Sequence, residues 1–109
     1  MRKKSTILAM IAAIGLIGFT ATPALAIDNV RCSDGAGYTE IHNEKRHCFA
    51  NAGYTGLYIT NVYQVSAGNN NITFWYRLNS NTLTYAQLNK GSAPKRFSPR
   101  VTVEALQIH

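Results

Sequence analysis

Residues 72–88, ITFWYRLNSNTLTYAQL, contain the clearest β-strand pattern in this chain. From Ile72 to Leu78 apolar side chains alternate with Thr, Trp and Arg, which is the two-residue period of a β-strand. Residues 79–81 then form a tight polar turn, and residues 82–88 provide the returning strand of a hairpin. If Ile72 and Phe74 face the core, Trp75 and Arg77 lie on the opposite, outer side.

In the rest of the chain from residue 27 onward, short alternating runs recur between segments rich in Gly, Asn, Ser and Pro, and no helical repeat is sustained. Further strands are predicted over Tyr38–Asn43, His47–Ala50, Leu57–Val65 and Val101–Ile108, the last with a bulge near Glu104 and Ala105. Asn89–Arg100 contains Gly91, Pro94 and Pro99 and is predicted to be a long exposed loop. The pattern is that of a single all-β domain.

The N-terminal segment is typical of a cleavable export signal. Three basic residues, Arg2, Lys3 and Lys4, precede an apolar run from Ile7 to Phe19, and the triplet Ala24, Leu25, Ala26 follows. The apolar run is shorter than the roughly 20 residues that a spanning helix needs, so we expect no stable membrane insertion. We therefore predict a signal peptide over residues 1–26, cleavage after Ala26, and a secreted domain over residues 27–109.

The two cysteines, Cys32 and Cys48, both lie in the predicted mature chain. An even cysteine count in an exported protein predicts a disulfide. The alternative, a metal or redox pair, would require CxxC spacing or further ligands, and the sequence has neither.

The formal net charge of +6 falls to about +3 once the basic signal is removed. This bias favours anionic surfaces such as wall polymers, whereas nucleic acid is a poor fit because no recognised motif is present. Half of the basic residues of the mature chain fall in the predicted loop: Lys90, Lys95, Arg96 and Arg100. They form either a solvated connection or an electrostatic patch that binds anionic envelope material.

The three histidines and five carboxylates follow no recognised catalytic pattern, so we predict binding rather than enzymatic activity. Trp75 and Arg77 are the best candidate contacts. The tyrosines at positions 38, 54, 58, 63 and 85 either fill the core or extend a contact platform. Asn69, Asn70 and Thr73 offer oxygen donors that calcium accepts, although an Asn-rich turn that satisfies its own backbone has the same composition. Apart from calcium, no cofactor is expected.

Two motifs point to a known family. Residues 48–53, CFANAG, followed after a strand by residues 66–70, SAGNN, resemble the actinobacterial single-domain branch of the βγ-crystallin superfamily, which includes the Streptomyces killer-toxin-like proteins. The resemblance covers residues 28–109. It implies a Greek-key β-sandwich of two packed sheets and an antimicrobial, antifungal or inhibitory protein. Phe74 stands where a serine would complete the calcium turn of that superfamily, and no second copy of the turn is evident.

We therefore expect a secreted, killer-toxin-like protein that contacts the cell wall or envelope of a competitor, and we expect a monomer. One alternative is an inhibitor of an extracellular protease or other hydrolase, whose secreted protein target would contact Gly53–Gly56 or the Pro-containing loop. The other alternative is a structural crystallin-like protein without a target.

Overall fold

The computed structural model describes residues 26–109, and the predicted signal peptide lies outside the described residues except for Ala26. No helix in this described part is long and apolar enough to cross a membrane. The chain forms strands β2 (Asp28–Val30), β3 (Thr39–His42), β4 (Arg46–Ala50), β5 (Gly53–Ser66), β6 (Ile72–Asn79), β7 (Thr82–Leu88) and β8 (Lys95–Ile108). The expected all-β fold is confirmed.

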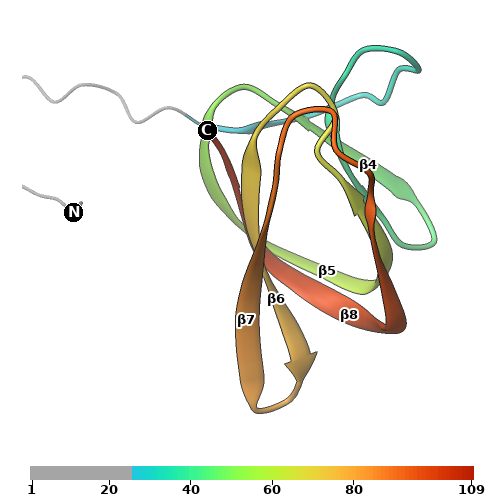
Figure 1. Ribbon diagram of the computed structural model, residues 1–109, viewed down its shortest axis with the longest axis vertical. Helices are drawn as coiled ribbons and strands as arrows, with labels where there is room; N and C mark the ends of the chain where they lie inside the picture. Colours follow the sequence, from blue (N-terminus) through green and yellow to red (C-terminus); the bar gives the residue numbers. More distant parts are fainter. Residues whose placement is uncertain (1–25) are drawn as a thin grey trace, which may run out of the picture.

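All strand pairs are antiparallel, in the order β2-β4-β3-β5-β8-β6-β7. After β5 the chain builds the β6–β7 hairpin and then returns as β8 between β5 and β6 (Figure 1). This return beside an earlier strand is the connection of a Greek key. β5 and β8 form the centre, where each pairs with the other and with one further strand.

β5 and β8 also divide the sheet into two layers. Their mutual register shifts between Gly56 and Ile59, between Ile59 and Val62, and between Val62 and Gln64. Such irregularities bend a strand and increase its twist. The two long strands therefore pass from the layer of β3 and β4 to the layer of β6 and β7, and the sheet folds over on itself as a sandwich (Figure 1).

The core lies between these layers. It consists of Ile41, Phe49, Val62, Val65, Ala67, Ile72, Phe74, Tyr76, Val101, Val103, Leu106 and Ile108. Phe49 from β4 and Phe74 from β6 are its largest fully buried side chains. The expected inward face of β6 is confirmed for Ile72 and Phe74, but Leu78 is 52% exposed because the hairpin extends beyond the core.

The predicted long loop is wrong in its second half. β8 begins at Lys95, and Lys95 and Arg96 pair with Val65 and Gln64 of β5. Pro99 falls where the register of β8 against β5 is interrupted, a position at which a strand tolerates proline. Phe97 holds this segment in place, because its ring centroid lies 4.8 Å from that of Tyr76 and 6.1 Å from that of Phe74.

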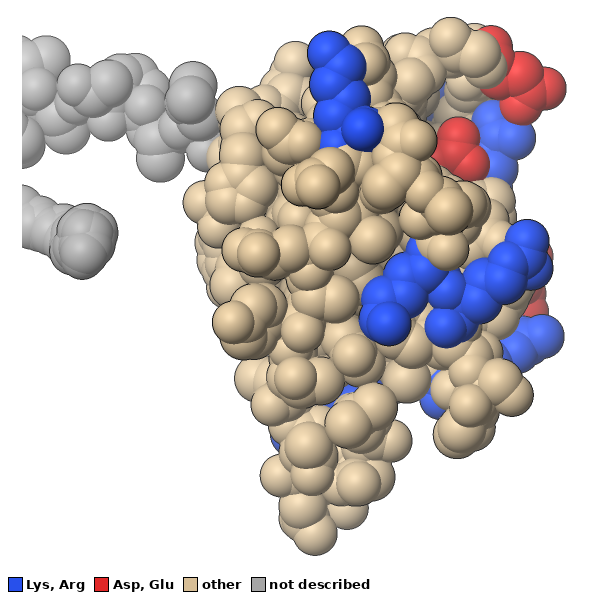
Figure 2. All heavy atoms as spheres, viewed as in Figure 1, with Lys and Arg blue, Asp and Glu red and all other residues tan. Residues whose placement is uncertain are grey.

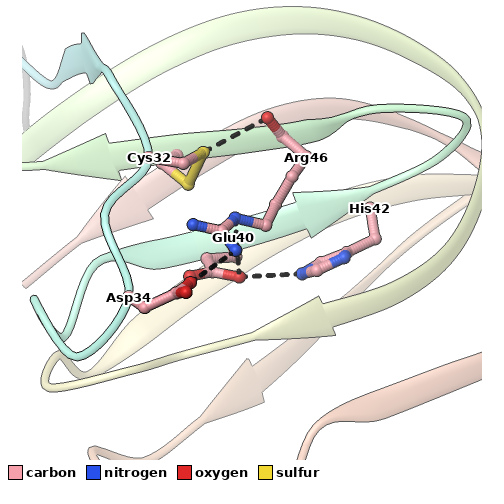
Figure 3. The surroundings of a disulfide bond; sticks show 6 residues. Cys32, Asp34, Glu40, His42 and Arg46 are labelled. Carbon is pink, nitrogen blue, oxygen red and sulfur yellow. Dashed lines mark hydrogen bonds and ion pairs between the residues drawn. A yellow bond between two sulfur atoms is a disulfide. The ribbon is translucent and has the colours of Figure 1, made fainter.

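The predicted disulfide between Cys32 and Cys48 is present. Cys48 is fully buried in β4, and Cys32 follows β2, the strand whose Val30 pairs with Cys48. Beside the bridge, Arg46 donates a hydrogen bond of 2.8 Å to Asp34, and a nitrogen of His42 lies 2.9 Å from Glu40 (Figure 3). The bridge and this polar network together hold the segment between β2 and β3 against β4.

We predict that replacing both cysteines, as Cys32→Ser with Cys48→Ala, lowers the free energy of unfolding by about 3 kcal/mol, because the bridge closes a loop over a sequence separation of 16 residues. Denaturant titration followed by circular dichroism measures the difference. Reduction of the unsubstituted protein is the matched control and should give the same loss. A loss below about 1 kcal/mol in both cases would contradict this role of the bridge.

Candidate functional site

The outer face of β6 presents Trp75 and Arg77, as the sequence predicts, and both side chains are half-buried. Trp75 pairs with Tyr85 on β7 and with Ala105 on β8, whereas Arg77 pairs with Leu83 on β7. Directly opposed residues of neighbouring strands point to the same side of a sheet. The hydrogen-bond register therefore builds one surface across several strands around Trp75.

Aromatic side chains dominate this surface. The Tyr54 ring of β5 meets the Trp75 ring edge-on, with 5.7 Å between their centroids. Tyr54, Tyr58 and Tyr85 are 59%, 76% and 60% exposed, so they line the surface and contribute little to the core. We call the surface formed by Tyr54, Tyr58, Trp75 and Tyr85 the outer aromatic face.

Two residues with little or no side chain, Gly56 and Ala105, leave a shallow depression in the middle of this face. Gly56 lies between Tyr54 and Tyr58 along β5 and pairs with Ala105 of β8. A Cβ atom placed on Gly56 would meet no atom within 4 Å, so the space above it is open. The aromatic rings stand around this open position.

An ion pair fixes the polar part of the face. Arg77 donates two hydrogen bonds to Glu104, from Nε at 2.6 Å and from a terminal nitrogen at 3.0 Å. These hydrogen bonds, assisted by the charge of Arg77, hold the pKa of Glu104 below its ordinary value of 4.5 against the opposing effect of desolvation. The same hydrogen bonds raise the pKa of Arg77. Both groups therefore stay charged at neutral pH.

The sequence pattern does not identify Glu104 as a partner of Arg77. The two residues are 27 positions apart, and the pairing depends on the bulge in β8. The β6–β8 register moves from Trp75 with Ala105 to Tyr76 with Val103, which leaves Glu104 as the extra residue. The predicted change of face near Glu104 was the available signal, but it does not reveal which strand lies alongside.

A hollow of about 300 Å³ adjoins the outer aromatic face. It is lined by Tyr58, Arg77, Leu78, Asn79, Ser80, Arg100, Val101, Thr102 and Glu104. Two of the predicted contact residues, Arg77 and Arg100, therefore line the same depression, although one comes from the hairpin and the other from β8.

The predicted basic contacts do not form one loop. Lys95 and Arg96 begin β8, where the Lys95 ammonium lies 5.5 Å from the centroid of the Phe97 ring. Arg100 lies over Tyr63 at 5.1 Å and reaches Glu44 at 3.8 Å. Figure 2 shows Lys and Arg side chains gathered toward the side of the molecule where β4 and the bent part of β8 lie.

Lys90 belongs to a different part of the surface. Its backbone N–H donates to the Asn71 side chain at 2.8 Å, and the next residue, Gly91, donates to the Gly68 carbonyl at 2.8 Å. This turn connects β7 to β8 and is held against the turn that connects β5 to β6. Of the six predicted binding residues, Trp75, Arg77 and Arg100 belong to the outer aromatic face and its hollow.

The three candidate calcium-binding residues form hydrogen bonds within the protein, through nitrogen atoms at Asn69 and Asn70 and through the hydroxyl at Thr73. The Asn70 amide donates to the Thr39 hydroxyl at 3.2 Å, and the Asn69 backbone N–H donates to the Gly37 carbonyl at 2.8 Å. Thr73 is buried, and its hydroxyl lies 2.8 Å from a ring nitrogen of His109. These contacts fit a turn that satisfies its own polar groups, and calcium binding at this turn stays a prediction.

Gly68 explains how this turn packs so closely. Its φ is +63°, and a Cβ there would overlap the backbone carbonyl of Tyr38 and lie 2.6 Å from that of Gly37. Only glycine combines this backbone conformation with so close an approach. The SAGNN segment that carries the family resemblance is thus a packing element in this structure.

Comparison with known proteins agrees with the fold and the sequence motifs. A family model described as Beta/Gamma crystallin matches residues 29–107. The solved structure of an antifungal protein from Streptomyces tendae Tu901 superposes with a TM-score of 0.66 and 28% sequence identity, covering 77% of this chain and all of that one. No curated protein matches the chain.

We predict that the Arg77–Glu104 pair makes the protein sensitive to acid. Because the folded-state pKa of Glu104 is lowered, the stabilisation is complete above about pH 4.5 and is lost as pH falls below that value. Glu104→Gln should therefore flatten the acid limb of a plot of unfolding free energy against pH, and Arg77→Gln should flatten it in the same way. An acid limb in both variants that runs parallel to that of the parent protein would contradict the assignment.

Proposed function

This chain belongs to the beta/gamma crystallin family, and from that premise we propose that it is a secreted antifungal protein that binds a cell-wall glycan without transforming it. The antifungal activity named for the Streptomyces structure supports the direction of the proposal, because that protein aligns over its whole length with this chain. The disulfide supports secretion, since such bonds persist in oxidising compartments.

The outer aromatic face is the observation on which the proposal depends. Among the described residues, four of the five exposed large hydrophobic side chains lie on this side of the sheet, on β5 and β7: Tyr54, Tyr58, Leu83 and Tyr85. The fifth, Leu78, follows the inward alternation of β6. Monomeric soluble proteins rarely expose a large contiguous apolar patch, and such patches commonly mark a binding site. A surface of this kind with Trp and Tyr at its centre has the composition of an interaction hot spot.

The shape and chemistry of the face fit a polysaccharide chain. It lies on a sheet rather than in an enclosed cavity, so it can accommodate an extended polymer. Aromatic rings pack against the C–H faces of sugar rings, while the Arg77–Glu104 pair, Gln87 and Gln107 offer donors and acceptors to hydroxyl groups. The open position above Gly56 gives the polymer room to approach the Trp75 ring.

The basic side chains serve a second, electrostatic role. Lys95 and Arg96 begin β8, and Arg100 lines the hollow next to Tyr58 and Arg77. In the proposed function these residues attract the protein to the anionic polymers and head groups of an envelope and raise the rate of encounter with it. The aromatic face then provides the short-range contact.

We predict that Trp75→Ala weakens binding to isolated fungal walls by at least about tenfold, whereas Trp75→Phe, which keeps a flat ring, retains most of it. Gly56→Val is a second test, because its side chain occupies open space above the face without disturbing the core. Co-sedimentation of the purified secreted protein with walls of a yeast and of a filamentous fungus gives the affinities. If the parent protein, Trp75→Ala and Gly56→Val bind the walls equally well, the outer aromatic face is not the binding surface.

Growth inhibition connects this binding to the antifungal role. The parent protein should slow growth of at least one fungus whose walls it binds, and Trp75→Ala should lose binding and inhibition together. Inhibition that survives in Trp75→Ala would separate the toxic activity from this surface. No inhibition and no wall binding would contradict the proposed function as a whole.

We predict that wall binding weakens as salt rises from about 50 to about 500 mM, because exposed charges are screened beyond a Debye length. The double variant Lys95→Ala with Arg96→Ala should bind more weakly at low salt and show a flatter salt dependence. Arg31→Ala, which removes an exposed charge next to the disulfide, is the matched control and should keep the slope of the parent protein. An unchanged slope in the double variant would contradict the electrostatic role.

A further inference from the structure

Among the described strands, the sheet has two open edges, and they differ in chemistry. β2 is the outermost strand on one side and β7 on the other. The outward side of an edge strand carries unpaired N–H and C=O groups that can pair with another strand. Natural proteins protect such edges with short strands, charges or proline.

The β2 edge has such protection. It is only three residues long, Asp28–Val30, and its first residue is an exposed carboxylate that accepts a hydrogen bond of 2.6 Å from the side chain of Asn51. A second strand would gain few backbone hydrogen bonds here and would have to displace or desolvate a charge.

The β7 edge has none of these features. Thr82–Leu88, TLTYAQL, is seven residues long and contains no charged residue and no proline. Leu83 and Tyr85 lie on the same face of the sheet as Trp75 and are 48% and 60% exposed. The nearest charged side chain on the same face, Arg77 opposite Leu83, is neutralised by its ion pair with Glu104. In a chain with net positive charge, β7 is a strip on which two copies can meet without like-charge repulsion.

We propose that β7 pairs antiparallel with β7 of a second copy of this chain, forming a weak symmetric dimer. A two-fold axis perpendicular to the sheet and passing beside Tyr85, the central residue of β7, pairs the greatest number of residues. In this register Tyr85 faces Tyr85 of the second copy, and Leu83 faces Gln87 on both sides of the axis. The pairing is self-complementary, which favours a second copy over an unrelated strand.

The dimer has a geometric consequence for the face. Residues directly opposite each other in antiparallel strands lie on the same side of the sheet, so the two outer aromatic faces become one continuous surface. Its strand order is β5-β8-β6-β7 followed by the same four strands in reverse. Tyr85 from each copy joins the centre of this surface, between the two Trp75 residues.

The proposed dimer departs from the monomer that the sequence led us to expect. A single pair of seven-residue strands is a small interface, so association belongs to the weak class of complexes, in the micromolar range or looser. A polymer that binds both faces would raise the effective concentration of the second one and strengthen attachment. Self-association itself does not depend on the proposed function and is testable without any glycan.

Sedimentation equilibrium of the purified secreted protein, from about 5 µM to about 1 mM, tests the proposal. The average mass should rise from that of a monomer toward that of a dimer. Tyr85→Glu and Tyr85→Lys each place like charges opposite one another across the axis, so each variant alone should remain monomeric. An equimolar mixture of the two variants should regain the dimer, because opposite charges then face each other.

Two control variants separate this edge from other contacts. Tyr54→Glu changes the outer aromatic face away from the edge, and Asn29→Lys changes the opposite edge, so both should dimerise like the parent protein. Circular dichroism confirms the fold of each variant. A parent protein that is monomeric at every concentration overturns the proposal. So does a dimer that survives both Tyr85 variants, or one that Tyr54→Glu abolishes, which would indicate stacking of the faces.

Discussion

Strand β6 has one face in the core and the other on the surface, and this division fixes the position of both neighbouring strands. Its inward residues Ile72, Phe74 and Tyr76 are buried, and its outward residues Trp75 and Arg77 are half-buried. A slip of one residue would exchange these sets, placing a guanidinium in the core and a phenyl ring in solvent. Burial of Phe74 therefore fixes the register of β6 with both neighbours, and the same register places Tyr85 and Ala105 beside Trp75.

Irregularities in the central strands then convert a regular sheet into a site. The bends of β5 and β8 fold the two layers over a common core, and the bulge at Glu104 brings a carboxylate to Arg77. Without that bulge, the charge of Arg77 would lie unpaired among aromatic rings. With it, the outer aromatic face combines flat apolar rings with an ion pair of fixed geometry, and Arg100 extends the same region through the hollow.

The alternation of apolar and polar residues predicted the features that depend on neighbouring residues in the chain. The bounds of β7 and the opposite faces of Phe74 and Trp75 follow from the period of two, and the disulfide follows from the cysteine count. Two features depend on contacts between distant segments and were missed. The first six residues of β8 belong to the loop that the sequence predicts from Gly91, Pro94 and Pro99, whereas in the structure Phe97 packs on Tyr76 and β5 provides a pairing strand. The ion pair between Arg77 and Glu104 depends on β8 lying beside β6. A short stretch of sequence does not show which strands are neighbours.

Family membership explains the fold, whereas the binding proposal depends on side chains that this chain places on that fold. Titration of the isotopically labelled protein with soluble oligosaccharides released from fungal walls, followed by amide chemical shifts, would locate the binding surface. The account predicts that the shifted amides cluster around Tyr54, Trp75 and Tyr85, with the Asn69–Asn70 turn unaffected. Shifts confined to that turn or to the segment around the disulfide, with none on β5, β6 and β7, would contradict it.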